Sequence, residues 1–146
     1  MRRQWWLYTL VAGAFLMIGA NAFSAGPFDK VIEARTQLMK DIGGFSKAMR
    51  QATDAAGVAA NADKLAEAFA KVNEETFPKG SSEGSRAKPE IWEKWDEFTA
   101  AAKNAVMLAQ GIATKARAGE DTAELVKGYG RSACGSCHRP FRLPKS

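Results

Sequence analysis

The chain has 146 residues, of which 46% are hydrophobic and 25% charged, and its formal net charge is +5. This length fits one domain, and the balance of apolar and charged residues excludes a generally disordered chain. The two cysteines and one histidine exclude a disulfide-rich scaffold and a zinc site built from several Cys and His ligands. The charge is mild and forms no basic stripe, so we expect no nucleic-acid partner.

The N-terminus predicts a secretory signal peptide over residues 1–22. A short basic start, Arg2 and Arg3, precedes a nearly unbroken apolar run, and small residues surround the cleavage point expected after Ala22 or as late as Ala25. A membrane anchor is the alternative, but the apolar run is shorter than the roughly 20 residues that span a bilayer. The domain is therefore expected to be residues 23–146, with no stable membrane insertion once the leader is removed.

Four later segments have helical periodicity, and none alternates like a strand. Apolar residues recur at steps of three and four, and two of the three links are short. These features predict an all-α, antiparallel up-and-down four-helix bundle with a left-handed twist. The expected helices are residues 29–51, residues 54 or 59 to 76, residues 89–118, and a segment from 121 that Pro140 and Pro144 end.

Two interruptions in this pattern have their own interpretation. Gly43-Gly44, inside the first helix, indicates close approach by a neighbour or a local bend. The polar stretch between residues 79 and 88 is rich in glycine and serine and is interpreted as a flexible, solvated connection.

The cysteines and the histidine form one motif, Cys134-Gly135-Ser136-Cys137-His138. This is C-x-x-C-H, the attachment pattern of c-type haem. Two thiols three positions apart on a helical turn point the same way and can add to both vinyl groups of one porphyrin, while the adjacent imidazole binds the iron. We therefore predict one haem c, bound covalently through Cys134 and Cys137, with His138 as an iron ligand.

Three other uses of the motif remain open: a redox dithiol, half a zinc site, or one short disulfide. Zinc needs about four ligands, more than this motif supplies. A thioredoxin-like dithiol belongs after a strand, at a helix N-terminus, whereas this motif ends a helical chain.

The chain resembles the cytochromes c-prime, the class II c-type cytochromes, and the resemblance covers all of residues 23–146. The C-terminal haem motif carries most of the specificity. The other matching residues are Arg35 and Met39, Gly43-Gly44, Phe77-Pro78, Lys88-Pro89-Glu90-Ile91-Trp92, Phe98 and Phe141-Arg142.

This resemblance implies a role for several residues. Cys134 and Cys137 would hold the haem by thioether bonds, with His138 as the proximal ligand. Arg35 would approach a haem propionate; it occupies an apolar face, where a charge needs a partner. Arg142 matches a basic residue near the proximal side, and Phe98 would pack in the core or against the haem edge.

Met39 matches the position over the distal face of the haem. In low-spin relatives a methionine there is the sixth iron ligand, whereas in five-coordinate members the side chain only shields the iron. The residues around Met39 resemble the low-spin group, so the metal ligands are predicted to be His138 and Met39. Met49 and Met107 are the other candidate ligands, but a methionine on a helical stripe is usually a core residue, and both are interpreted so.

The resulting hypothesis is a carrier of single electrons in the periplasm of a Gram-negative bacterium. The alternative is a five-coordinate cytochrome c-prime that binds nitric oxide or carbon monoxide at an open distal site. An enzyme such as a peroxidase is disfavoured, because no second histidine is present for distal acid–base work. Redox partner proteins of unknown identity are expected, and the resemblance adds a homodimer through the first two helices.

Overall fold

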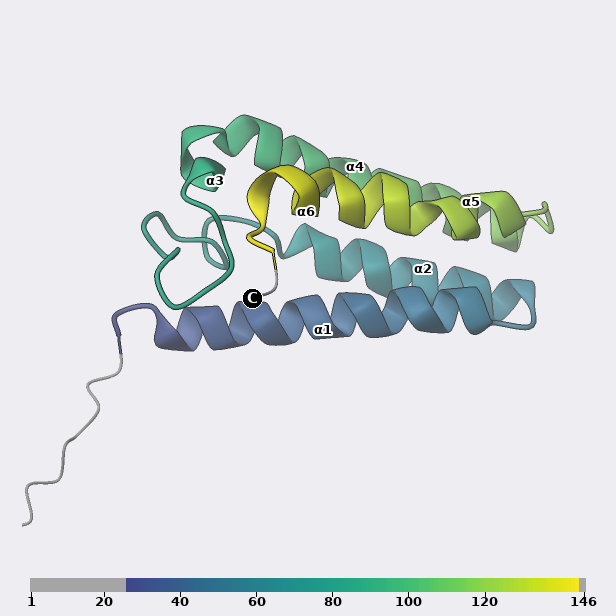
Figure 1. Ribbon diagram of the computed structural model, residues 1–146. Coiled ribbons are helices and arrows are strands. Elements are labelled where there is room, and N and C mark those ends of the chain that lie inside the picture. The colour runs from purple at the N-terminus through teal and green to yellow at the C-terminus, as the bar shows by residue number, and fades with distance from the viewer. Residues whose placement is uncertain (1–25, 145–146) are drawn as a thin grey trace, which may run out of the picture.

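The computed structural model describes residues 26–144, which fold into a bundle of alternately directed helical rods (Figure 1). The predicted signal peptide and both candidate cleavage points lie outside the described residues and stay predictions. The elements in chain order are α1 (Asp29–Gln51), α2 (Ala55–Ala70), α3 (Glu90–Glu93), α4 (Trp95–Arg117), α5 (Ala123–Tyr129), the π-helical segment η1 (Gly130–Cys134) and α6 (Gly135–Phe141).

The predicted all-α, up-and-down four-helix bundle is confirmed. Three rods are α1, α2 and α4, and the fourth is the continuous run α5–η1–α6. Over residues 26–144 no β-strand forms, and the one isolated bridge joins Ala87 to Arg142. The left-handed twist stays a prediction. Within the same residues, no helix is both long enough and apolar enough to cross a membrane.

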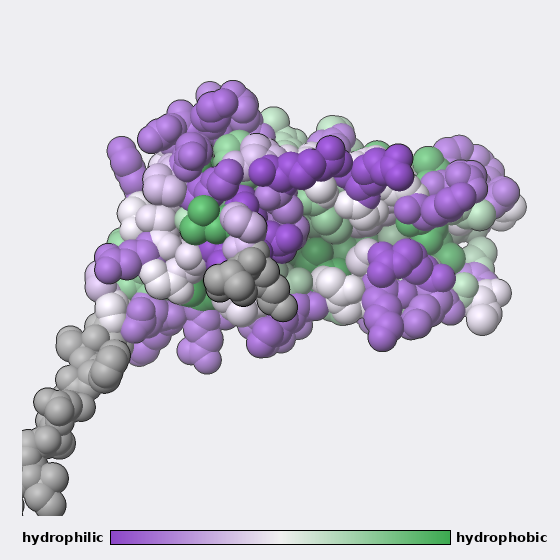
Figure 2. Space-filling model, viewed as in Figure 1, coloured by the Kyte–Doolittle hydropathy of each residue, from purple (hydrophilic) through white to green (hydrophobic). Residues whose placement is uncertain are grey.

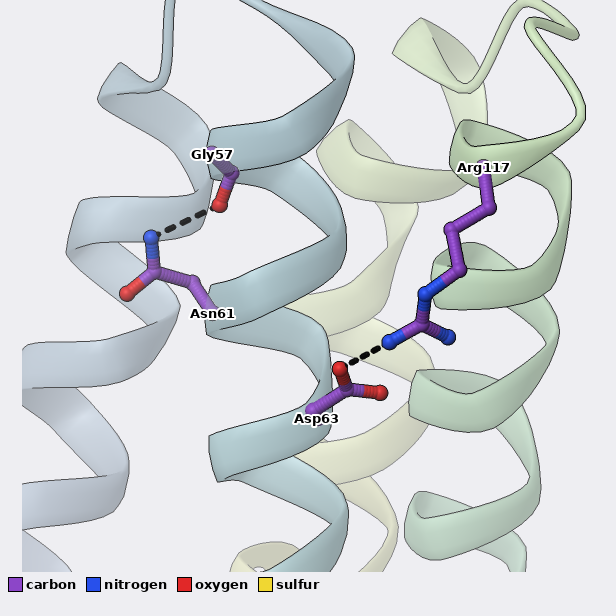
Figure 3. A network of polar contacts seen from close by, with 4 residues as sticks. All are labelled: Gly57, Asn61, Asp63 and Arg117. Atoms are coloured by element: carbon purple, nitrogen blue, oxygen red, sulfur yellow. Dashed lines mark hydrogen bonds and ion pairs between the residues drawn. The ribbon is translucent and has the colours of Figure 1, made fainter.

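Small residues on the facing sides of α2 and α4 let these two helices pack closely. The buried alanines are Ala59, Ala62, Ala66 and Ala68 on α2 and Ala102, Ala105, Ala109, Ala113 and Ala116 on α4. At the surface, Arg117 on α4 pairs with Asp63 on α2, while Asn61 donates to the Gly57 carbonyl at 2.8 Å (Figure 3). Both partners of the ion pair are partly exposed, so it adds at most about 1 kcal/mol.

The second helix ends at Ala70, and its predicted extension to residue 76 is wrong. Side chains after Ala70 bond to the nearby backbone instead. The Thr76 hydroxyl donates to the Lys71 carbonyl at 2.7 Å, and the Asn73 side-chain oxygen accepts from the Glu75 amide at 2.9 Å. Such local bonds give the backbone an alternative to another helical turn.

The third predicted helix is interrupted, because Lys94 leaves helical geometry (φ −122°, ψ 45°) and separates α3 from α4. The single turn of α3 instead places the Trp92 indole where it donates to the Phe77 carbonyl at 3.0 Å. The fourth helix also differs from prediction, since Pro140 lies inside α6 rather than ending it. The last turn still closes, because the Arg142 amide donates to the His138 carbonyl at 3.3 Å.

The interpretation of Gly43-Gly44 as a point of close protein contact is wrong. Helix α1 runs through both residues without interruption. A methyl group added at either glycine would meet no atom within 4 Å beyond its chain neighbours and the backbone of its own helix. Gly43 lines the cavity described below, so the missing side chain leaves space on the cavity wall.

Candidate functional site

A cavity of about 600 Å³ opens between α1 and α6 and reaches the buried faces of α2 and α4. Figure 2 shows hydrophobic residues in a hollow between α1 and the α5–η1–α6 rod, with hydrophilic residues on both sides of it. The volume lies within the range typical of ligand and cofactor sites.

The walls of this cavity combine an apolar surface with positive charge. Apolar side chains come from every neighbouring element: Ile32, Met39, Ile42, Phe69, Val72, Phe77, Ala87, Ile91, Phe98, Ala102 and Phe141. Four cationic residues, Arg35, Lys40, Arg86 and Arg142, also line it, and no carboxylate side chain among residues 26–144 does. This arrangement suits a large apolar molecule that carries negative groups.

The predicted motif lies on the cavity wall formed by η1 and α6. Cys134 ends η1, and Cys137 and His138 follow within the first turns of α6. All three side chains line the cavity. A π-helical segment adds one residue to a turn and so changes which residues of the following helix face inward. The Gly135 amide bonds to the Gly130 carbonyl across this segment.

Both cysteines are free thiols in the structure, so the short disulfide does not form here. Over residues 26–144 no three His, Cys, Asp or Glu side chains group as a metal site. Burial raises the pKa of both thiols. Burial, together with the nearby charges of Arg142 and Arg86, lowers the pKa of His138, which favours the neutral imidazole that binds metals.

Met39 lines the same cavity from α1, whereas the motif lines it from η1 and α6. The other two methionines considered from the sequence do not line it. Met49 is buried in the core, whereas Met107 is 62% exposed on α4, so its interpretation as a core residue is wrong. The structure therefore brings Met39 together with Cys134, Cys137 and His138.

Arg35 is almost fully buried and lines the cavity, but its guanidinium already has protein partners. Its two terminal nitrogens donate to Ser81, one to the hydroxyl at 3.1 Å and one to the carbonyl at 2.9 Å. The guanidinium also lies 4.7 Å from the centre of the Phe77 ring, and burial lowers its pKa. Arg35 thus joins α1 to the loop that follows α2.

That loop is not the freely solvated connection predicted from its composition. Ser81 is fully buried, and the stretch from Gly84 to Ala87 forms part of the cavity wall. The Arg86 side chain donates to the Leu143 carbonyl at 2.7 and 3.1 Å, and the Leu143 amide donates to the Arg86 carbonyl at 2.8 Å. Sequence reasoning missed Ser81 and Arg86, because their partners lie 46 and 57 residues away.

Phe98 is buried on α4 and lines the cavity within a group of aromatic rings. Its ring centre lies 4.8 Å from that of Phe77 and 5.5 Å from those of Trp95 and Phe141. The interplanar angles of 62° with Phe77 and 89° with Phe141 are edge-to-face, a favourable aromatic geometry. Arg142 is exposed one turn beyond His138, at the edge of the cavity.

Arg35→Met is expected to destabilise the protein by about 1–3 kcal/mol, because the buried Ser81 hydroxyl and carbonyl would lose charged donors. Urea unfolding of the haem-loaded protein measures this change, and hydrogen exchange at Ser81 and Ser85 should accelerate. Arg117→Met is the matched control, since its ion pair is exposed and its loss should cost less than about 1 kcal/mol. Equal costs for the two variants would contradict the anchoring role of Arg35.

Known proteins with similar sequences are c-type cytochromes, in agreement with a C-x-x-C-H motif on the cavity wall. The family described as Cytochrome C' matches residues 30–142. A cytochrome c-556 of Agrobacterium fabrum is 35% identical over 123 residues, covering 78% of this chain and 82% of the relative. A cytochrome c' of Pararhodospirillum photometricum is 34% identical over 119 residues, covering 76% of this chain and 94% of the relative.

A solved structure is similar as well. It is a cytochrome c' described by its unusual ligand-controlled dimer dissociation, and it matches with a TM-score of 0.65 and 26% identity, covering 83% of this chain and 100% of that one. The bundle, the C-x-x-C-H motif on the cavity wall and the family match over residues 30–142 agree with one another. The chain therefore belongs to the cytochrome c' family of electron-transfer proteins with covalently bound haem c.

Proposed function

We propose that this chain is a periplasmic one-electron carrier in which His138 and Met39 are the two axial ligands of a haem c held by Cys134 and Cys137. One observation carries the proposal: these four side chains line the same cavity, three from the η1–α6 wall and Met39 from α1. Neutral imidazole and thioether sulfur are ligands found in c-type cytochromes.

The cavity fits the group that the family implies. Its apolar lining suits a porphyrin, and its cations suit the two propionates. Of these cations, Arg86 and Arg142 are exposed at the edge of the cavity, where charged groups remain close to water. When bound, the haem supplies a ferric–ferrous couple that accepts or releases one electron.

The residues of this chain have three tasks around such a group. Phe77, Phe98 and Phe141 exclude water from the cavity. This limits the reorganisation of solvent when the haem would change its oxidation state. Arg35 would offer a buried positive charge to a propionate, as the resemblance implies, while it holds the loop through Ser81. Met39, from α1, would occupy the position where a small ligand otherwise binds.

Two observations support the second candidate, a five-coordinate protein that binds nitric oxide or carbon monoxide. Met39 is only half-buried, and Gly43, one turn further along α1, leaves free space on the same wall of the cavity. A methionine that shields the iron without binding it would then leave a site for a diatomic ligand.

An absorption spectrum of the haem-loaded protein in both oxidation states tests the proposal. We expect a low-spin spectrum, with a sharp α band in the reduced protein, a sulfur-to-iron band in the oxidised protein, and no change when carbon monoxide is added. A broad high-spin spectrum that shifts with carbon monoxide would contradict methionine ligation and favour the second candidate.

The cellular setting is part of the same proposal. A signal peptide over residues 1–22 would direct residues 23–146 to the periplasm, where the haem domain would meet its redox partners. A homodimer is also proposed, since one structural neighbour is described by its ligand-controlled dimer dissociation. Fractionation of the native host, followed by N-terminal sequencing, would show the compartment and the cleavage point directly.

A further inference from the structure

A second pocket, of about 680 Å³, lies next to His138 and opens to solvent. It is formed where the loop before α3 meets the C-terminal end of α6. Its lining consists of Arg86, Lys88, His138, Arg139 and Arg142, together with Leu143 and Pro144.

This pocket has a strong positive charge. Four of its lining residues are cationic, and among the described residues 26–144 no acidic side chain lines it. The ion pairs found over residues 26–144 are Lys94–Glu97, Lys115–Glu120, Arg117–Asp63 and Lys127–Glu124, so none of them involves the pocket. The guanidinium groups of Arg86 and Arg139 donate to backbone carbonyls, which position these side chains without neutralising them.

The pocket shares a wall with the haem cavity. Arg86, His138 and Arg142 line both, whereas Lys88 and Arg139 line the outer pocket and not the cavity. A group seated in the outer pocket would therefore be separated from the cavity by the side chains that line both, with His138 among them. Beside the cations, Leu143 is 45% exposed, so the pocket also offers an apolar contact.

We propose that this pocket is a docking site for the acidic surface of a redox partner protein, and this inference rests on the proposed electron-carrier function. Charge complementarity selects the partner, because the cations of this pocket attract carboxylates and repel basic surfaces, and Lys88 and Arg139 lie outside the haem cavity and so remain available to a partner. The apolar contact at Leu143 and Pro144 adds the surface burial that a protein interface needs. Docking here brings the partner beside the predicted iron ligand, where electron transfer distances are short.

The double variant Lys88→Glu/Arg139→Glu tests the docking site without touching the cavity lining. The matched control is Lys47→Glu/Lys103→Glu, which changes the net charge equally at exposed positions on α1 and α4 that line neither pocket. The probe is a fluorescent hexaglutamate peptide, whose anisotropy is followed with haem-loaded protein at low ionic strength. We expect binding to weaken about tenfold or more in the first variant and much less in the control.

Equal weakening in both variants would overturn the proposal, because binding would then follow net charge alone. Inorganic phosphate is added at a concentration that supplies the same total negative charge as the peptide. If phosphate displaces the peptide under these conditions, the proposal is overturned and the pocket is assigned to small anions. Absorption spectra of all variants should equal that of the unmodified protein. A failed docking test with unchanged spectra would thus leave the proposed electron-carrier function standing.

Oxidation kinetics provide a second readout with small reagents of opposite charge. Hexacyanoferrate(III), an anion, should oxidise the Lys88→Glu/Arg139→Glu protein several-fold more slowly than the control at low ionic strength. Oxidation by the cation tris(phenanthroline)cobalt(III) should instead be unchanged or faster. The same response to both reagents would contradict an electrostatic docking site beside His138.

Discussion

The variant Cys134→Ala/Cys137→Ala is expected to lose covalent haem completely, because no other cysteine is present in the chain. Denaturing electrophoresis followed by haem staining should show a stained band for the unmodified protein and none for the variant. Both thiols line the cavity, so the change removes the attachment points and leaves the rest of the cavity wall in place.

The same variant should also be less stable. Without an attached porphyrin, the phenylalanine and isoleucine side chains around a space of about 600 Å³ have no packing partner. By analogy with large cavities in other cores, the free energy of unfolding should fall by at least about 3 kcal/mol, as measured by urea unfolding.

Ser136→Ala is the matched control for the cysteine variant. Ser136 lies between the two cysteines, and its hydroxyl donates to the Ala133 carbonyl one turn earlier at 2.7 Å. This variant should keep its haem stain and nearly all its stability. Haem staining that persists in the double cysteine variant, or that disappears in Ser136→Ala, would contradict attachment through Cys134 and Cys137.

The second large effect is expected for Met39→Ala. Removing the thioether should convert a low-spin spectrum to a high-spin one, allow carbon monoxide to bind, and lower the reduction potential, because methionine ligation favours ferrous iron. Absorption spectroscopy and a redox titration of the purified protein measure all three changes.

Met107→Ala is the control, since Met107 is exposed on α4 and does not line the cavity. Its spectrum and potential should match those of the unmodified protein. An unchanged low-spin spectrum in Met39→Ala would exclude Met39 as the sixth ligand. A high-spin spectrum of the unmodified protein would show that Met39 does not bind the iron and only covers it.

The sequence was informative where function depends on local spacing. Cys134, Cys137 and His138 lie within five consecutive residues, so helical geometry predicts their common position on one wall. Met39 and Arg35 lie one turn apart on an amphipathic helix, and this spacing predicts that both belong to the inward face of α1.

What could not be predicted depends on contacts between distant segments. The bond from Arg35 to Ser81 and the pairing of Arg86 with Leu143 join segments 46 and 57 residues apart, and no local pattern marks such partners. Composition alone made residues 79–88 resemble a solvated loop, although tertiary bonds bury Ser81. The end of α2 at Ala70 depends on competing side-chain bonds of Asn73 and Thr76, which helical periodicity does not detect.

A haem covalently attached within the cavity between α1 and α6 is the basis of the proposed function. Intact mass spectrometry of protein purified from its native host tests this attachment most directly. Tryptic digestion then locates the added mass. We expect the mass of the processed polypeptide plus one haem, with the added mass on the peptide of residues 132–142. An unmodified polypeptide mass would contradict the covalent attachment and, with it, the proposed function.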